Sequence, residues 1–185
     1  MVGFQSTILD GQLCKAGATL AGTPGPFIVR SENPDDVLLL VHVFEAPLEA
    51  VFDAWTERNE WQAWLGPEGV RCEVAELEAI VGGRYKLTML PDGGAPIPVV
   101  GLFKTVDRPH RLVFTWGYQG DDSRQSLITL SFRSLGPAKT EMTLKQQGLG
   151  SKSNRDAHGA GWESAFQKLA SHLARTNSSI IRRSS

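Results

Sequence analysis

The sequence has few cysteines and no pattern of them that indicates chemistry. Its two cysteines, Cys14 and Cys72, lie in unrelated contexts and make no metal-binding or redox spacing. A domain of 185 residues buries roughly two-thirds of its unfolded surface, so it needs neither disulfides nor a metal for stability. Free thiols are typical of a reducing compartment, although a single disulfide stays open at this point. We therefore predict no metal site and no cofactor.

The sequence also lacks an excess of charge of either sign. The chain has 19 Lys and Arg against 20 Asp and Glu, for a net charge of −1, and these residues are scattered. Nucleic-acid-binding proteins usually carry a basic stripe, and the only clustered basic pair here is Arg182–Arg183. We therefore predict no nucleic-acid partner.

Long apolar runs are absent as well. No run approaches the ~20 residues that span a bilayer. The N-terminus has neither a basic leader nor the apolar core of a secretory signal. The sequence thus predicts a cytoplasmic protein without a membrane span.

Three segments differ in composition. Residues 1–36 are rich in Gly and Pro without periodicity, which predicts an N-terminal extension with at most one short strand, at Phe27–Arg30. Residues 37–175 carry regular apolar patterns and form the predicted domain. Residues 176–185 are predicted to be a polar C-terminal tail.

The domain opens with an apolar run of strand length, Val37–Phe44. Pro47 suits the first turn of a helix, and a second short helix ends at Gly66-Pro67. The next eighty residues alternate between strands and turn residues. Such short links favour an antiparallel meander, because parallel pairing needs long crossovers. The expected strands are Val70–Leu77, Arg84–Leu90, Ile97–Val106, Arg111–Trp116, Gln125–Arg133 and Thr140–Gln146.

A long amphipathic helix is expected at Ser153–Arg175. Ser153 and Asp156 have the spacing of a capping signal, and large residues recur at steps of three and four. A sheet with one apolar face must bury it, and this helix is its only large partner. The prediction is an α+β fold in which a seven-stranded curved antiparallel sheet surrounds the long C-terminal helix, with two short helices after the first strand. A gap between sheet and helix in such a fold suits an apolar ligand.

Several short segments form a recognisable series along the chain. They are Glu45–Thr56 with Trp61, Trp64 and Gly66-Pro67, then Gly82–Tyr85, Gly101, Pro109–Trp116, Asp156–His158 and Gly161–Glu163. Together these segments resemble the activator-of-heat-shock-protein-90-ATPase homologue-like family, within the START/birch-pollen-allergen (SRPBCC) superfamily of helix-grip proteins. The resemblance covers about residues 37 to 175, in the right order and spacing.

The resemblance implies a helix-grip fold and a cavity that holds an apolar molecule. Relatives include a co-chaperone domain, polyketide aromatase/cyclases and lipid-transfer proteins. The co-chaperones carry a larger N-terminal domain whose pattern the short extension here does not show. We therefore expect a module that binds an apolar small molecule. A chaperone- or stress-related protein-interaction module and a homodimer stay open.

The predicted ligand-binding residues are large side chains on the inner faces of the sheet and helices. His158 is either a polar group at the cavity mouth or a structural histidine that joins helix and sheet. An alternative hypothesis is a cyclase- or hydrolase-like enzyme that uses His158, Tyr85 or Arg84, but no residue is assigned as catalytic. The predicted set is Trp61, Trp64, Tyr85, Leu87, Phe103, Phe114, Trp116, Leu130, His158, Trp162 and Phe166.

Overall fold

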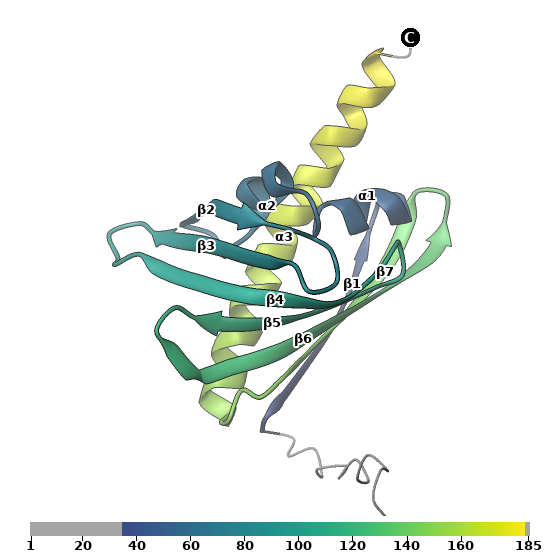
Figure 1. The fold of residues 1–185 in the computed structure, drawn as a ribbon. Helices are drawn as coiled ribbons and strands as arrows, with labels where there is room; N and C mark the ends of the chain where they lie inside the picture. Colours follow the sequence, from purple (N-terminus) through teal and green to yellow (C-terminus); the bar gives the residue numbers. More distant parts are fainter. Residues whose placement is uncertain (1–34, 184–185) are drawn as a thin grey trace, which may run out of the picture. The chain divides into compact units, whose positions relative to one another are not determined.

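The computed structural model describes residues 35–183, with side chains described for residues 35–121 and 125–176. The strand predicted at Phe27–Arg30 lies outside the described residues. Figure 1 shows the described part as one sheet with a long helix, α3 (Lys152–Arg183), running across one of its faces.

The strands are β1 (Val37–Phe44), β2 (Val70–Leu77), β3 (Arg84–Pro91), β4 (Ile97–Asp107), β5 (Arg111–Tyr118), β6 (Asp121–Gly136) and β7 (Lys139–Gln147). They form one seven-stranded sheet that is antiparallel throughout, in the order β1-β7-β6-β5-β4-β3-β2. This confirms the predicted antiparallel meander from β2 to β7, and β1 pairs with β7, a pairing that was not predicted.

Two short helices, α1 (Leu48–Asp53) and α2 (Arg58–Trp64), follow β1, as predicted. The long helix α3 spans Lys152–Arg183. Its buried residues Trp162, Phe166, Leu169 and Leu173 recur at three- and four-residue steps and face the sheet, which confirms the predicted apolar stripe.

The predicted C-terminal end of the long helix and its predicted capping residue were wrong, whereas the predicted start lies within one residue of Lys152. The helix continues to Arg183, so residues 176–183 do not form a separate tail, and no Gly or Pro after Arg175 stops it. At the start, the Ser151 hydroxyl accepts the backbone N–H of Asn154 at 3.2 Å, so Ser151 is the capping residue in place of Ser153.

Close approach of two strands explains Gly101 on β4. A Cβ at this position would lie 2.1 Å from the Thr115 carbonyl oxygen and 2.3 Å from the Tyr85 ring. Glycine is therefore required, as expected for a strand glycine at a bend. The space that it leaves lets the Tyr85 hydroxyl donate to the Thr115 carbonyl at 2.7 Å.

Candidate functional site

Aromatic side chains fill most of the space between the sheet, α2 and α3. Trp61 of α2 lies with its ring centroid 5.0 Å from that of Tyr85. The ring centroid of Trp55, which follows α1, lies 4.7 Å from that of Trp64 and 5.7 Å from that of Trp162. Edge-to-face and tilted pairs at such distances pack as a core does.

Eight of the eleven predicted ligand-binding residues belong to this core. Each is at most 2% exposed, and within residues 35–176 none of the eight lines either cavity described below. They are Trp61, Trp64, Tyr85, Leu87, Phe103, Phe114, Leu130 and Phe166. The remaining three, Trp116, His158 and Trp162, do line a cavity.

An apolar cavity of about 300 Å³ lies between the end of the sheet and the N-terminal half of α3. The helix contributes small residues at four-residue steps, Ala157, Gly161 and Ala165, beside Trp162. Residues four apart share one face of a helix, so this face leaves room instead of filling it. The opposite wall is lined by Leu65, Gly66, Pro67, Met89, Ile97, Trp116 and Tyr118.

A second cavity, of about 310 Å³, shares Trp116, Tyr118 and His158 with the first. Its other walls are more polar and come from β6, the β7–α3 loop and the first turn of α3. They are formed by Ser126, Gly148, Leu149, Gly150, Ser151 and Asn154. The two cavities thus meet at the same three side chains.

His158 links α3 to β5 at this meeting point. Its Nδ1 lies 2.9 Å from the Asn154 carbonyl oxygen, and its Nε2 lies 3.5 Å from the Tyr118 hydroxyl. A carbonyl oxygen only accepts, so the Nδ1–H donates this hydrogen bond. His158 thus joins the helix to the sheet and also lines both cavities, and a role in orienting a ligand stays a prediction.

A buried hydrogen-bond chain holds the wall that contains Trp116 and Trp162. The Trp162 indole N–H donates to Gln146 Oε1 at 2.8 Å, and Gln146 Nε2 donates to the Ser126 hydroxyl at 2.8 Å. That hydroxyl donates to the Trp116 carbonyl at 3.2 Å. Because Gln146 is fully buried, this chain ties α3, β7, β6 and β5 together at the cavity.

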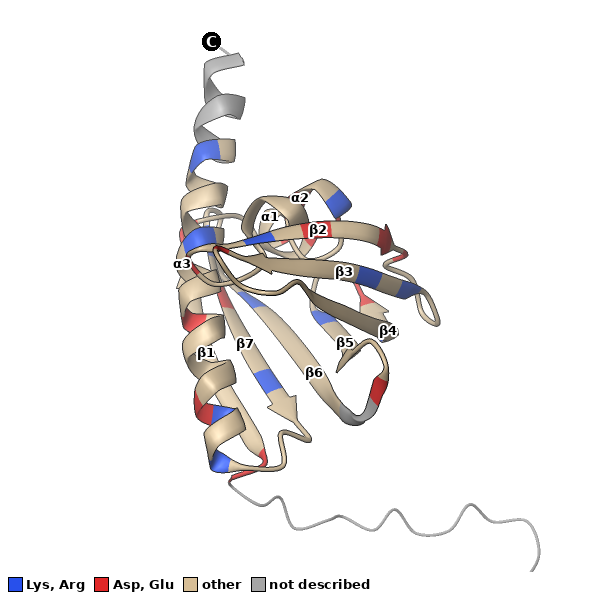
Figure 2. Ribbon diagram, turned by 90° about the vertical axis from the view of Figure 1, so that its left-hand side faces the viewer, with Lys and Arg blue, Asp and Glu red and all other residues tan. Residues whose placement is uncertain are grey.

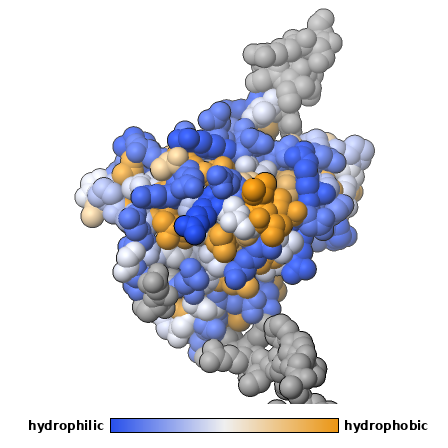
Figure 3. Space-filling view, viewed as in Figure 1, coloured by the Kyte–Doolittle hydropathy of each residue, from blue (hydrophilic) through white to orange (hydrophobic). Residues whose placement is uncertain are grey.

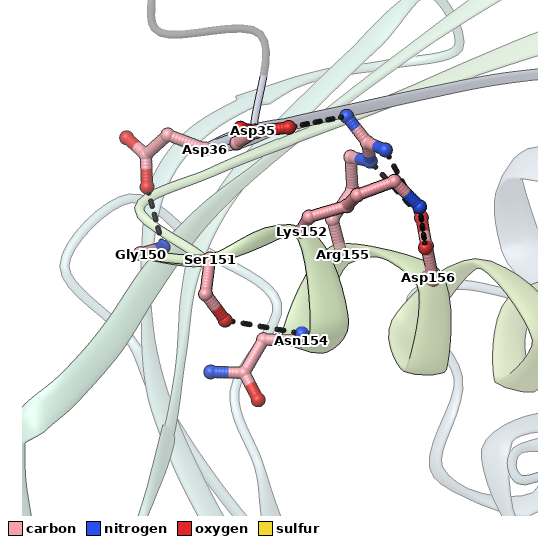
Figure 4. Close-up of polar contacts among 8 residues, drawn as sticks. All are labelled: Asp35, Asp36, Gly150, Ser151, Lys152, Asn154, Arg155 and Asp156. Carbon is pink, nitrogen blue, oxygen red and sulfur yellow. Dashed lines mark hydrogen bonds and ion pairs between the residues drawn. The ribbon is translucent and has the colours of Figure 1, made fainter.

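Polar contacts also fix the rim of the second cavity (Figure 4). The Gly150 backbone N–H donates to Asp36 Oδ1 at 2.6 Å, and Arg155 pairs with Asp35 at 3.4 Å. Asp35 and Asp36 were predicted to belong to the N-terminal extension, but these contacts hold them to the start of α3. The loop before α3 is thereby held against the start of β1.

The residues of the enzyme hypothesis do not converge. The Tyr85 hydroxyl donates its proton to a hydrogen bond with the Thr115 carbonyl. Burial raises the pKa of Tyr85 well above its ordinary value. Arg84 is exposed and lines neither cavity. Only His158 of the three reaches a cavity.

Sequence reasoning missed several lining residues for identifiable reasons. Tyr118 has the strand parity of Trp116, but the strand was predicted to end at Trp116. Ala157, Gly161 and Ala165 are small, and a search for large apolar residues passes over them. Their regular four-residue spacing on a helix was the signal that could have found them.

Other surfaces show no comparable grouping. Figure 2 shows acidic and basic residues interspersed over the described part. Among the described residues, no three His, Cys, Asp or Glu side chains gather as metal ligands. No helix within residues 35–183 is both long and apolar enough to cross a membrane.

Apolar side chains are exposed in places, as the space-filling view of one face shows (Figure 3). On the edge strand β1, the alternate residues Leu39, Val41 and Val43 are 62%, 59% and 40% exposed. Nothing in the structure identifies what would cover them, so a homodimer and a protein partner stay predictions.

The curved antiparallel sheet around a long C-terminal helix, with two short helices after the first strand, defines a helix-grip domain of the START type. The chain belongs to the family described as Activator of Hsp90 ATPase homolog 1-like protein, whose model matches residues 45–174. This confirms the resemblance that the sequence motifs indicated.

Solved structures with this fold come from several bacteria. An AHSA1 protein from Silicibacter pomeroyi is 27% identical with a TM-score of 0.68, over 76% of this chain and 99% of that one. A protein from Chromobacterium violaceum is 25% identical with a TM-score of 0.68, over 75% and 96%. DynU16, from the dynemicin biosynthetic locus, is 21% identical with a TM-score of 0.62, over 76% and 48%, and shows the fold alone. Comparison with curated protein sequences finds no match.

Proposed function

We propose that this protein binds an apolar small molecule in the cavity between α3 and the ends of β3, β4 and β5. The observation that carries the proposal is the small-residue face of α3, Ala157, Gly161 and Ala165, opposite an otherwise apolar wall. The volume of about 300 Å³ lies at the lower end of the range of small-molecule sites. The ligand is therefore a compact molecule.

Two features favour a preformed site in the cavity beside α3 over a site among the buried core side chains. The core leaves no room at the eight buried positions without moving side chains that are at most 2% exposed. The Trp162–Gln146–Ser126 chain holds the cavity wall in place without a ligand. A rigid wall reduces the entropy that binding costs.

The first test is native mass spectrometry of the purified protein, followed by organic extraction, to detect a co-purified apolar molecule. The second is a fluorescence titration with the uncharged dye N-phenyl-1-naphthylamine. We expect saturable binding by the wild-type protein.

A matched pair of variants locates the dye. Ala157 and Ala160 are both exposed on α3, but only Ala157 lines the cavity. Ala157→Leu should weaken dye binding roughly tenfold by filling the cavity, the equivalent of about 1.4 kcal/mol. Ala160→Leu should leave it unchanged. Absence of dye binding, or equal binding by both variants and the wild type, would sink the proposal.

A further inference from the structure

The polar cavity next to the apolar one indicates which kind of head group the ligand carries. This inference rests on the proposed function, because it extends the same site across the shared residues Trp116, Tyr118 and His158. A molecule seated in the apolar cavity that passes these three side chains reaches Ser126 and Asn154.

The side chains it reaches there present acceptor atoms. Ser126 is 6% exposed, and its single hydroxyl proton is donated to the Trp116 carbonyl. Its oxygen already accepts one hydrogen bond, from Gln146 Nε2. A hydroxyl oxygen has two lone pairs, so one acceptor position is left.

Asn154 adds a second acceptor. It uses its Nδ2 to donate to the Leu149 carbonyl at 3.1 Å, which assigns that nitrogen and leaves Oδ1 as an acceptor (Figure 4 shows the side chain on the first turn of α3). His158 adds none, because its Nδ1 faces the Asn154 carbonyl at 2.9 Å and its Nε2 faces the Tyr118 hydroxyl at 3.5 Å.

These two acceptors favour a hydrogen-bond donor on the ligand, and their position in the fold disfavours a cationic donor. Gly150 and Ser151 directly precede α3 and Asn154 lies in its first turn, where the helix dipole disfavours positive charge. A neutral O–H donates without adding charge.

We propose that the ligand is a neutral amphiphile whose hydroxyl group, an alcohol or a phenol, binds in the polar cavity while its hydrocarbon part fills the apolar one. The hydroxyl donates to the acceptor on Ser126 or on Asn154.

The test is displacement of bound N-phenyl-1-naphthylamine by three matched compounds: 6-phenylhexan-1-ol, its methyl ether 1-methoxy-6-phenylhexane, and 6-phenylhexylamine. The ether keeps the hydrocarbon part and loses the donor. We expect the alcohol to displace the dye at a concentration roughly five- to tenfold lower than the ether, which is the effect of about one hydrogen bond. The amine, charged at neutral pH, should be weaker than the alcohol.

Variants then locate the head group. Ser126→Ala and Asn154→Ala each remove an acceptor, and the double variant should reduce the advantage of the alcohol over the ether to about twofold or less. Ser153→Ala, an exposed first-turn position that lines neither cavity, should keep the full advantage. Circular dichroism checks that each variant is folded, and the wild-type comparison of alcohol and ether needs no variant at all.

The outcomes separate the two proposals. Equal displacement by alcohol and ether, or tightest binding by the amine, overturns the hydroxyl head group and leaves an apolar site intact. Failure of every compound to displace a bound dye overturns the hydroxyl head group as well. Failure of the dye to bind overturns the proposed function itself.

Discussion

Replacing Trp162 by Phe tests whether the buried hydrogen-bond chain stabilises the sheet against α3. The change removes the indole N–H and leaves Gln146 Oε1 buried without its donor. An unsatisfied buried acceptor costs about 1–3 kcal/mol. The smaller ring also loses contact with Trp55 and Trp116, whose centroids lie 5.7 and 5.4 Å away. We expect a total loss of about 2–4 kcal/mol in the free energy of unfolding. Trp162→Ala, which removes the whole ring, should cost about 3–5 kcal/mol.

A double-mutant cycle isolates the hydrogen bond. Gln146→Leu alone leaves the Trp162 N–H without an acceptor, whereas in the double variant neither partner is left unsatisfied. The loss of stability in the double variant should therefore be smaller than the sum of the two single losses by about 1–2 kcal/mol. Gln125→Leu, at an exposed position of β6, is the control and should change stability by less than about 0.5 kcal/mol.

The measurement is equilibrium unfolding in urea followed by far-UV circular dichroism, which does not depend on the tryptophan being changed. Strictly additive losses, or a Trp162→Phe variant as stable as the wild type, would refute the reasoning that this chain holds the wall of the cavity.

Two further predictions concern the glycines of α3 and the buried thiol of Cys72. Gly161→Ala should raise the free energy of unfolding by up to about 1 kcal/mol, because alanine favours the helix and its Cβ would meet no atom within 4 Å. Gly159→Ala should raise the free energy of unfolding less, since its Cβ would lie 3.3 Å from Leu38 Cδ1. If urea unfolding shows Gly159→Ala to be the more stable of the two variants, this placement of α3 is contradicted. Burial raises the pKa of the Cys72 thiol to about 12, so the folded protein resists ionisation of this thiol. The contribution of Cys72 to stability should be complete below about pH 9 and decline as the pH rises towards 12. In a Cys14→Ser variant the remaining thiol should react with a disulfide reagent at pH 8 only after unfolding. Rapid reaction of the folded protein would show that Cys72 is accessible.

The order and kind of the elements could be predicted from the sequence because local patterns encode them. Val37–Phe44 and Val70–Leu77 were predicted with the bounds that the structure has. Turn residues between short apolar runs leave antiparallel pairing as the only short connection. The ends of α3 could not be predicted as well. Ser151 and Ser153 both have capping chemistry, and the contacts of Asp35 and Asp36 with the start of α3 are made only in the folded domain.

The candidate site was decided by the tertiary structure. Periodicity identifies which residues face inward, and it correctly placed Trp61, Tyr85 and Phe114 on inner faces, all of them fully buried or nearly so. It does not report how completely those side chains fill the interior, because packing depends on sheet curvature and on where each ring meets its neighbours. In this protein the large rings close the centre of the fold. The remaining space opens where α3 presents Ala157 and Gly161, since residues that small cannot reach the sheet.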